Sequence, residues 1–196
     1  MKQVNNFEKK RFIIEECMLA SFQAGVQTRN KNYPVYNKLP DAFTNKREIR
    51  FQYDNTSNLK TSIFDFLDQY LTEIQEKGVT EVVHLAKIQE LADRLTVQFK
   101  LVLHQGHFRI GISQKIINLF LKYMWSMGEI PEPFHCPMDG IVKKKILENI
   151  AKTVLVDWTQ LDTIKDYLDY VEAVKQIAEK ENLSIAQWEF LNWGRR

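Results

Sequence analysis

Residues 108–143 read FRIGISQKIINLFLKYMWSMGEIPEPFHCPMDGIVK and combine apolar helix patterns with residues that interrupt helices. Gly111 stands between two apolar residues, which indicates a tight turn before a helix over residues 113–127. Three prolines between residues 131 and 137 then break the chain, because proline cannot continue a helix. Asp139 follows them and is a typical N-cap, so we expect a new helix to start there.

Most of the remaining chain has the same helical periodicity. Apolar residues recur at helical spacing over residues 7–24, 62–78, 80–99, 139–150, 162–178 and 184–193. Ser184 and Gln187 have the pattern of a capping box, which predicts that Ser184 is the N-cap of the last helix. Residues 26–59 differ, because they are rich in turn residues and because residues 49–53 alternate as a short strand would. Seven Gly and five Pro are too few for a many-stranded sandwich or barrel. The sequence therefore predicts an all-α fold, a compact bundle of about seven helices with one long irregular loop near residues 26–59.

The composition is that of an ordinary soluble protein, with 44% hydrophobic and 27% charged residues in a chain of 196. We expect a single helical domain over residues 1–196, which a cleft could divide into two lobes. The sequence has no signal-peptide pattern and no run of 18 apolar residues. Two cysteines, Cys17 and Cys136, cannot form a disulfide scaffold. These features favour a cytoplasmic protein that does not cross a membrane.

The formal charge of +2 hides an uneven distribution along the chain. Residues 1–60 contain 11 Lys and Arg against 6 Asp and Glu, whereas residues 111–196 contain 11 against 12. The basic front is either a solvated face or a local surface that binds phosphate.

Lys115 and Asp139 are the residues that are best suited to catalytic chemistry. If the helix starts at Ser113, Lys115 lies in its first turn, where the helix dipole disfavours a cation and should lower the pKa of the amine. A lysine of lowered pKa is suited to nucleophilic chemistry. Asp139, at the start of the next helix, should be held ionised by backbone N–H groups. A reaction that uses both side chains requires them to share one cleft, within hydrogen-bond reach or one bridging water.

The order of these residues resembles the helix-hairpin-helix DNA glycosylase superfamily, which includes the 8-oxoguanine glycosylases and endonuclease III. Residues 111–115 (GISQK) match the hairpin and its catalytic lysine, and residues 137–139 (PMD) match the aspartate turn. Ser113 replaces the second hairpin glycine, and Met138 is bulkier than the residue that usually precedes the aspartate. The 24-residue interval from Lys115 to Asp139 is longer than in the commoner members, although archaeal 8-oxoguanine glycosylases also have a stretched interval. The sequence has no four-cysteine iron–sulfur loop.

This resemblance implies a DNA base-excision glycosylase with AP lyase activity, possessing no cofactor and acting as a monomer on duplex DNA. Lys115 would attack C1′ of a nucleotide flipped out of the helix, an oxidised purine being one candidate, and Asp139 would stabilise the sugar cation. The residues implied for binding DNA phosphates are Gly111, Ser113, Gln114 and Lys143. The aromatic residues that could receive the base are Trp125, Phe134, Trp158, Trp188 and Trp193.

Two alternatives stay open on sequence grounds. His104, His107, His135 and Cys136 could bind zinc, but adjacent residues such as His135 and Cys136 rarely converge on one tetrahedral ion, and we predict no metal site. Cys136 as a nucleophile is weaker still, because no residue is seen to orient a base. The second alternative is a non-catalytic helical domain that binds nucleic acid or another protein.

Overall fold

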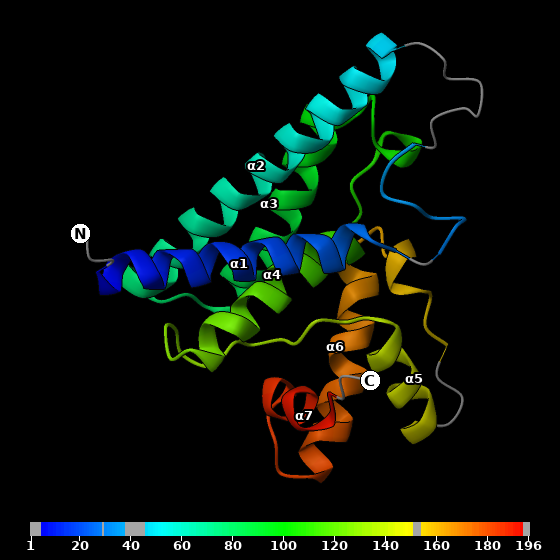
Figure 1. Ribbon diagram of the computed structural model, residues 1–196. Coiled ribbons are helices and arrows are strands. Elements are labelled where there is room, and N and C mark those ends of the chain that lie inside the picture. The colour runs from blue at the N-terminus through cyan, green and yellow to red at the C-terminus, as the bar shows by residue number, and fades with distance from the viewer. Residues whose placement is uncertain (1–4, 29, 38–45, 151–153, 194–196) are drawn as a thin grey trace.

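The computed structural model describes residues 5–28, 30–37, 46–150 and 154–193, with only the backbone described for residues 46–54. These parts of the chain form a compact all-α bundle, as predicted (Figure 1). The helices are α1 (Asn6–Val26), α2 (Lys46–Lys77), α3 (Glu81–Phe99), α4 (Ile110–Ser126), α5 (Gly140–Asn149), α6 (Ile164–Lys180) and α7 (Ile185–Asn192), with two 3₁₀ helices, η1 (His104–Gly106) and η2 (Trp158–Gln160). No helix within the described ranges is both long and apolar enough to span a membrane.

Helix α4 occupies the centre of the bundle. It packs against α1, α3, α6 and η2. Helices α5 and α7 pack against α6 and form with it a second half of the molecule, beside the half that contains α1, α2 and α3 (Figure 1). Ile112, Ile116 and Ile117 are buried. Ile112 and Ile116 are four positions apart and lie on the same side of α4, whereas Ile117 is turned about 100° from Ile116, so α4 is buried on more than one side. Each fully buried side chain of this size contributes about 1.5–3 kcal/mol. The segment with the strongest sequence signal therefore forms the middle of the core.

The predicted N-caps at Asp139 and Ser184 are confirmed. Asp139 precedes α5, and its carboxylate accepts hydrogen bonds from the N–H groups of Ile141 and Val142. Ser184 forms a capping box with Gln187 at the start of α7. Such local hydrogen bonds pair N–H groups that the helix itself leaves free, which explains why these boundaries could be predicted.

The predicted loop over residues 26–59 is wrong for its second part. Residues 46–59 form the first half of α2, and the expected strand at residues 49–53 is helical; residues 38–45 lie outside the described part. An isolated strand leaves its backbone N–H and C=O groups unpaired, whereas a helix pairs them within the segment. The buried Leu59 joins this half of α2 to the core, and the Thr61 hydroxyl donates to the Ser57 carbonyl. Tertiary packing thus overrides the turn preference of residues 54–58.

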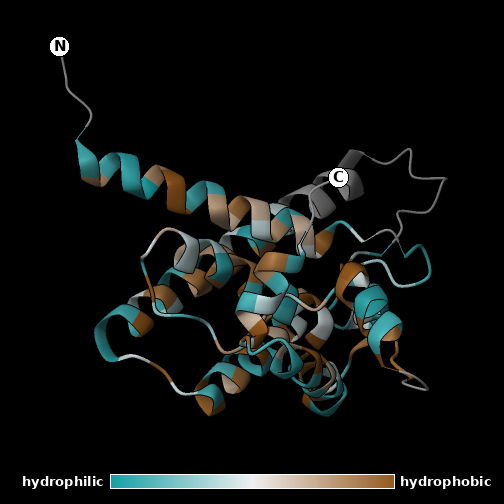
Figure 2. Ribbon diagram, turned by 90° about the horizontal axis from the view of Figure 1, so that it is seen from below, coloured by the Kyte–Doolittle hydropathy of each residue, from teal (hydrophilic) through white to brown (hydrophobic). Residues whose placement is uncertain are grey.

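The N-terminal part of α1 projects from the bundle (Figure 2) and exposes Phe7 and Phe12. Lys10 forms an ion pair with Glu129 at 2.6 Å, and Arg11 pairs with Asp68. Part of the basic front of the sequence is therefore neutralised by acidic residues of other elements. Arg29 and the side chains of Lys46, Arg47 and Arg50 are outside the described residues.

Gly111 allows α4 to approach η2 closely. Its N–H donates to the Leu161 carbonyl at 3.0 Å, and a Cβ placed on Gly111 would lie 1.6 Å from the Trp158 carbonyl oxygen. Only glycine fits this contact, because any side chain would overlap the backbone of η2. The contact fixes η2, and with it Trp158, against the start of α4.

A chain of buried polar side chains crosses the core. The Tyr70 hydroxyl lies 3.0 Å from His84 Nδ1, and the His84 ring lies against the His135 ring with centroids 5.1 Å apart. His135 Nδ1 lies 2.9 Å from the Tyr167 hydroxyl, which accepts from Asn118 Nδ2 at 2.9 Å. These residues come from α2, α3, α4, α6 and the segment before α5, so the network joins the two halves of the molecule.

We predict that Gly111→Ala lowers the free energy of unfolding by about 3 kcal/mol, because the new methyl group meets a backbone atom that cannot rotate away. Gly140→Ala is the matched control, since no atom lies within 4 Å of a Cβ at this first residue of α5. This variant should keep or slightly raise the stability. Urea unfolding of both variants measures the difference, and equal stabilities would contradict the close contact.

We also predict that stability falls in mild acid because of His84. Burial, with a further contribution from His135, lowers the pKa of His84 from 6.5 to about 3. Between these pH values the unfolded chain binds a proton that the folded protein does not, so unfolding becomes easier as the pH falls, by about 1.4 kcal/mol per pH unit. Urea unfolding between about pH 4 and pH 7 should show a shallower slope for His84→Gln. An unchanged slope would argue against a neutral, buried His84.

Candidate functional site

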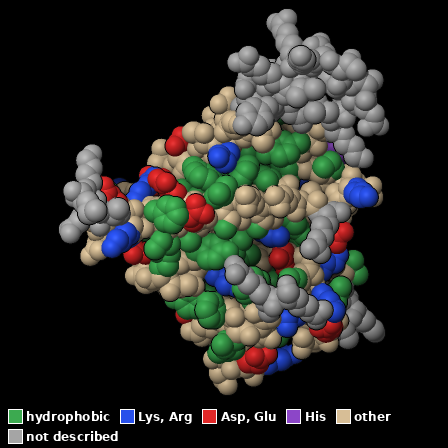
Figure 3. All heavy atoms as spheres, in the orientation of Figure 1, with side chains coloured by type: hydrophobic (Ala, Val, Ile, Leu, Met, Phe, Trp, Pro, Cys, Tyr) green, Lys and Arg blue, Asp and Glu red, His purple; other side chains and the backbone are tan. Residues whose placement is uncertain are grey.

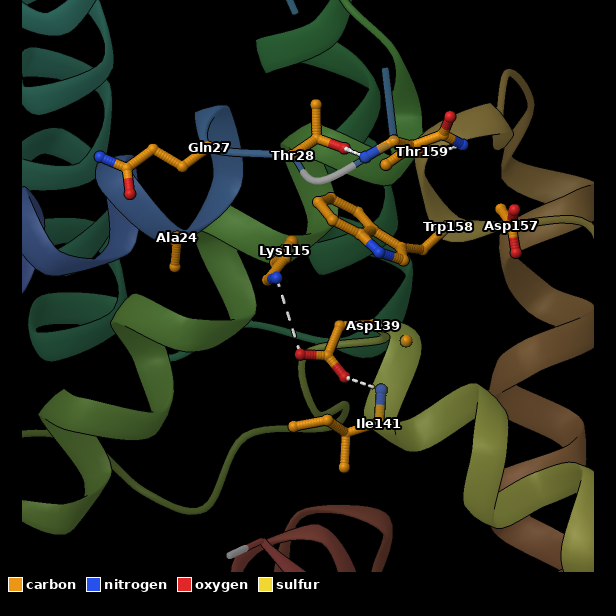
Figure 4. Close-up of a pocket in the computed structure, with 11 residues that line it drawn as sticks. Ala24, Gln27, Thr28, Lys115, Asp139, Ile141, Asp157, Trp158 and Thr159 are labelled. Carbon is orange, nitrogen blue, oxygen red and sulfur yellow. Dashed lines mark hydrogen bonds and ion pairs between the residues drawn. The ribbon is translucent and has the colours of Figure 1, made fainter. Parts of the chain in front are cut away.

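The structure brings Lys115 and Asp139 together in one pocket (Figure 4). Lys115 Nζ lies 3.6 Å from Asp139 Oδ2, and the two side chains are 14% and 20% exposed. Lys115 comes from the second turn of α4, and Asp139 is the N-cap of α5. The sequence-based requirement that the two groups share a cleft is therefore met.

The two carboxylate oxygens of Asp139 have different partners. Oδ1 accepts hydrogen bonds from the N–H groups of Ile141, at 2.8 Å, and Val142, at 3.2 Å. Oδ2 faces Lys115 (Figure 4). The N–H groups and dipole at the start of α5 favour a negative charge, so the carboxylate is held in place by its helix while one oxygen stays available to the pocket.

Lys115 lies between a carboxylate and an aromatic ring. Its Nζ is 4.2 Å from the centroid of the Trp158 ring, within the range of a cation–π interaction. The expectation that Lys115 occupies the first turn of its helix is wrong, because α4 starts at Ile110 rather than near Ser113. The dipole argument for its reactivity therefore does not apply. Its surroundings are set instead by Asp139 and Trp158.

The pocket has a volume of about 600 Å³ and is open to solvent, a size within the usual range for small-molecule sites. Its walls come from the end of α1 and the following residues, from α4, from the start of α5 and from η2. The lining residues are Ala24, Gln27, Thr28, Asn30, Lys115, Asp139, Gly140, Ile141, Asp157, Trp158 and Thr159. Asn30 Nδ2 donates to the Thr159 hydroxyl at 3.0 Å and so connects the first wall to the last.

The interpretation of the hairpin as a phosphate-binding surface needs correction. The side chains of Ser113 and Gln114 are completely buried, and the Gly111 N–H is already bonded to Leu161. Ser113 donates its hydroxyl to the Ile88 carbonyl on α3 at 2.6 Å, so it faces the core and not DNA. Lys143 differs from these residues, because its Nζ pairs with Asp157 at 2.7 Å beside the pocket. A contact between Lys143 and a DNA phosphate stays a prediction.

Of the aromatic residues proposed to receive a base, only Trp158 lines this pocket. The Trp125 ring packs edge-on against Phe190 on α7, and Trp188 is buried with its indole N–H donating to Glu181. The Phe134 ring lies against the His84 ring, outside this pocket. The Trp193 ring lies 4.4 Å from Lys122 Nζ. These four aromatic residues therefore lie outside the pocket that contains Lys115 and Asp139.

The alternative zinc ligands do not assemble. His135 bonds to Glu81 and Tyr167, whereas the Cys136 thiol faces Met138 sulfur. Over the described ranges, no three His, Cys, Asp or Glu residues are arranged to bind a metal ion. Burial raises the pKa of Cys136 well above its usual value, so the thiol is unsuited to act as a nucleophile.

Sequence reasoning missed the pocket wall formed by Gln27, Asn30 and Thr159. These residues lie on segments far apart in the chain, with no recognisable motif. Only the packing of η2 against the start of α4 brings the last of them to the pocket. A local pattern could not have identified them.

Comparison with known proteins gives no relative. No family model matches the sequence, and neither the curated proteins nor the solved structures yield a significant match. Lys115, Asp139 and the pocket around them are therefore the features of this protein that indicate a function.

Proposed function

We propose that this protein is a DNA base-excision glycosylase with Lys115-dependent AP lyase activity. The observation that supports this proposal is the placement of Lys115 Nζ 3.6 Å from Asp139 Oδ2 inside an open pocket. The two residues are 24 positions apart in the sequence and were singled out by their resemblance to a glycosylase motif. The proposal implies a cytoplasmic enzyme that acts as a monomer on duplex DNA, with an oxidised purine as the first lesion to test.

In the proposed reaction, Lys115 first gives one proton to solvent and then, as a neutral amine, forms a bond to C1′ of the damaged nucleotide. The bond between C1′ and the base breaks at the same centre, and the base leaves with the bonding electrons. The negative Asp139 carboxylate stabilises the positive charge that develops on the sugar and accepts the proton that Nζ releases. The carboxylate stabilises this cation more strongly once the bound nucleotide has displaced water from the pocket.

The covalent intermediate would then cleave the strand. Asp139 passes the proton it took from Nζ to O4′ as the sugar ring opens, which gives a Schiff base between Nζ and C1′ and makes the C2′ proton acidic. Asp139 then accepts the C2′ proton, and the bond between C3′ and its oxygen breaks and releases the 3′ phosphate, which is β-elimination. Water finally hydrolyses the Schiff base and regenerates the Lys115 amine.

The pocket suits a nucleotide that has left the base stack. Its volume of about 600 Å³ can hold a base and sugar, and Trp158 contributes an aromatic face. Gln27 and Asn30 contribute amide groups to its wall, which can hydrogen-bond the edge of a base.

The charge distribution permits contact with only a short stretch of DNA. Lys and Arg side chains are scattered among Asp and Glu on the face that Figure 3 shows, without one broad basic patch among the residues drawn in colour. Lys143 beside the pocket and the exposed Lys144 are placed to meet a few phosphates. We therefore expect binding of modest affinity that weakens as salt increases.

Borohydride trapping tests the proposal. Borohydride reduces a Schiff base to a stable amine, so incubation with duplexes that contain 8-oxoguanine or an abasic site should yield a covalent protein–DNA adduct. Lys115→Gln should abolish the adduct, because it removes the amine. Asp139→Asn should slow adduct formation by about 10²- to 10⁴-fold, the usual range for a group that assists proton transfer.

Lys87→Gln is the matched control. Lys87 is also a partly buried lysine with carboxylate partners and aromatic neighbours, but it lies on α3, outside the pocket. Its removal should leave trapping unchanged. A wild-type protein that gives no adduct with either duplex, or a Lys115→Gln protein that still gives one, would reject the proposed activity. Salt-dependent duplex binding without any adduct would support the non-catalytic binding domain instead.

A further inference from the structure

Gln114 has a buried side-chain amide that forms hydrogen bonds with the backbone of Met138, the residue before Asp139. Its Oε1 accepts from the Met138 N–H at 3.0 Å, and its Nε2 donates to the Met138 carbonyl at 2.6 Å. Nε2 also donates to the Gly111 carbonyl at 2.9 Å. Both polar groups of one residue are thus held by one side chain, and the residue that follows is Asp139. The partners fix the orientation of the amide, since an N–H requires the oxygen and a carbonyl requires the nitrogen.

Asn118 reinforces this contact one turn further along α4. Its Nδ2 donates to the Cys136 carbonyl at 3.1 Å and to Gln114 Oε1 at 3.2 Å. Residues four positions apart lie on the same side of a helix, so Gln114 and Asn118 form one polar strip that faces the segment before α5. Both side chains are completely buried. The segment from Cys136 to Met138 is therefore attached to α4 through side-chain amides.

These contacts connect the two members of the site. Lys115 directly follows Gln114 in α4, and Asp139 directly follows Met138. A change in how Gln114 holds Met138 would move Asp139 relative to Lys115, because each of these two residues is one peptide bond away from a residue of the contact. The Lys115–Asp139 distance of 3.6 Å is therefore set by the Gln114 amide as well as by the cap of α5.

We propose that Gln114 is a positioning residue, whose buried amide fixes the Met138 backbone and thereby holds the Asp139 carboxylate against Lys115. This inference rests on the proposed glycosylase function. Gln114 does not reach the pocket and would not touch DNA. It acts through Asp139, and its effect should appear in the rate of adduct formation rather than in duplex affinity.

The test compares two substitutions in the trapping assay with an abasic duplex. Gln114→Met keeps the length of the side chain but loses all of its hydrogen bonds. We expect trapping at saturating DNA to slow by about 10²-fold, since a displacement of about 1 Å can cost this much, while the duplex dissociation constant changes less than about twofold.

Gln114→Glu adds a readout that depends on pH. A neutral carboxylic acid can still accept from the Met138 N–H and donate to a carbonyl, whereas an ionised one would face the Met138 carbonyl with a second negative oxygen. Burial favours the neutral acid. The trapping rate of Gln114→Glu, divided by that of the wild type, should therefore rise several-fold between about pH 8 and pH 6. Because this measurement uses Gln114→Glu alone, it tests the inference even when Gln114→Met does not fold.

Ser113→Ala is the matched control. Ser113 is the preceding residue, equally buried, and loses one hydrogen bond to α3 without touching Met138. Its trapping rate should stay within about twofold of the wild type. Equal losses in Ser113→Ala and Gln114→Met, or a Gln114→Glu ratio that does not change with pH, would overturn the positioning role.

A separate measurement applies if the wild type itself forms no adduct, which would reject the proposed function. In that case the coupling between Gln114 and Asp139 is measured by thermal unfolding. Asp139→Ala removes the cap of α5 and lowers the melting temperature, and the loss should be at least halved when Gln114→Met is already present, because Asp139 is then no longer held in its capping position. The same loss in both backgrounds would overturn the inference independently of any activity.

Discussion

The rest of the structure depends on the contact between Gly111 and the backbone of η2. At this point α4 lies so close to the Trp158 carbonyl that no side chain fits between them. The contact places Trp158 over Lys115 and brings Thr159 within reach of Asn30. One face of the pocket is therefore a consequence of how α4 begins. The hairpin glycine serves helix packing, which is a different role from the phosphate contact that the sequence suggested.

Helix α4 carries the site because it is buried on almost every side. Gln114 and Asn118 hold the segment before α5 through hydrogen bonds, and the apolar residues of α4 pack against α1 and α3. Lys115 is one of the few positions of this helix that reach solvent, and it does so inside the pocket. A buried helix that carries one reactive side chain into a pocket suits a reaction that needs fixed geometry.

Much of the fold could be predicted from the sequence, because helical periodicity and N-caps are local signals. The start of α5 at Asp139 and the capping box of α7 both depend on residues within four positions of each other. The pairing of Lys115 with Asp139 was anticipated only through the resemblance to a known motif. The first half of α2 was missed, because its turn-forming residues are overridden by packing at Leu59. Gln27, Asn30 and Thr159 could not be assigned to the site, since their proximity is decided by contacts between distant segments.

We propose that Lys115 is the amine that attacks DNA. Mass spectrometric mapping of the borohydride-reduced adduct tests it most directly, because digestion with a protease leaves the DNA remnant on the peptide that carried the reacting amine. We expect the remnant on Lys115 alone. Its attachment to the N-terminal amine, or to any lysine outside the pocket, would contradict the mechanism even if trapping itself succeeds.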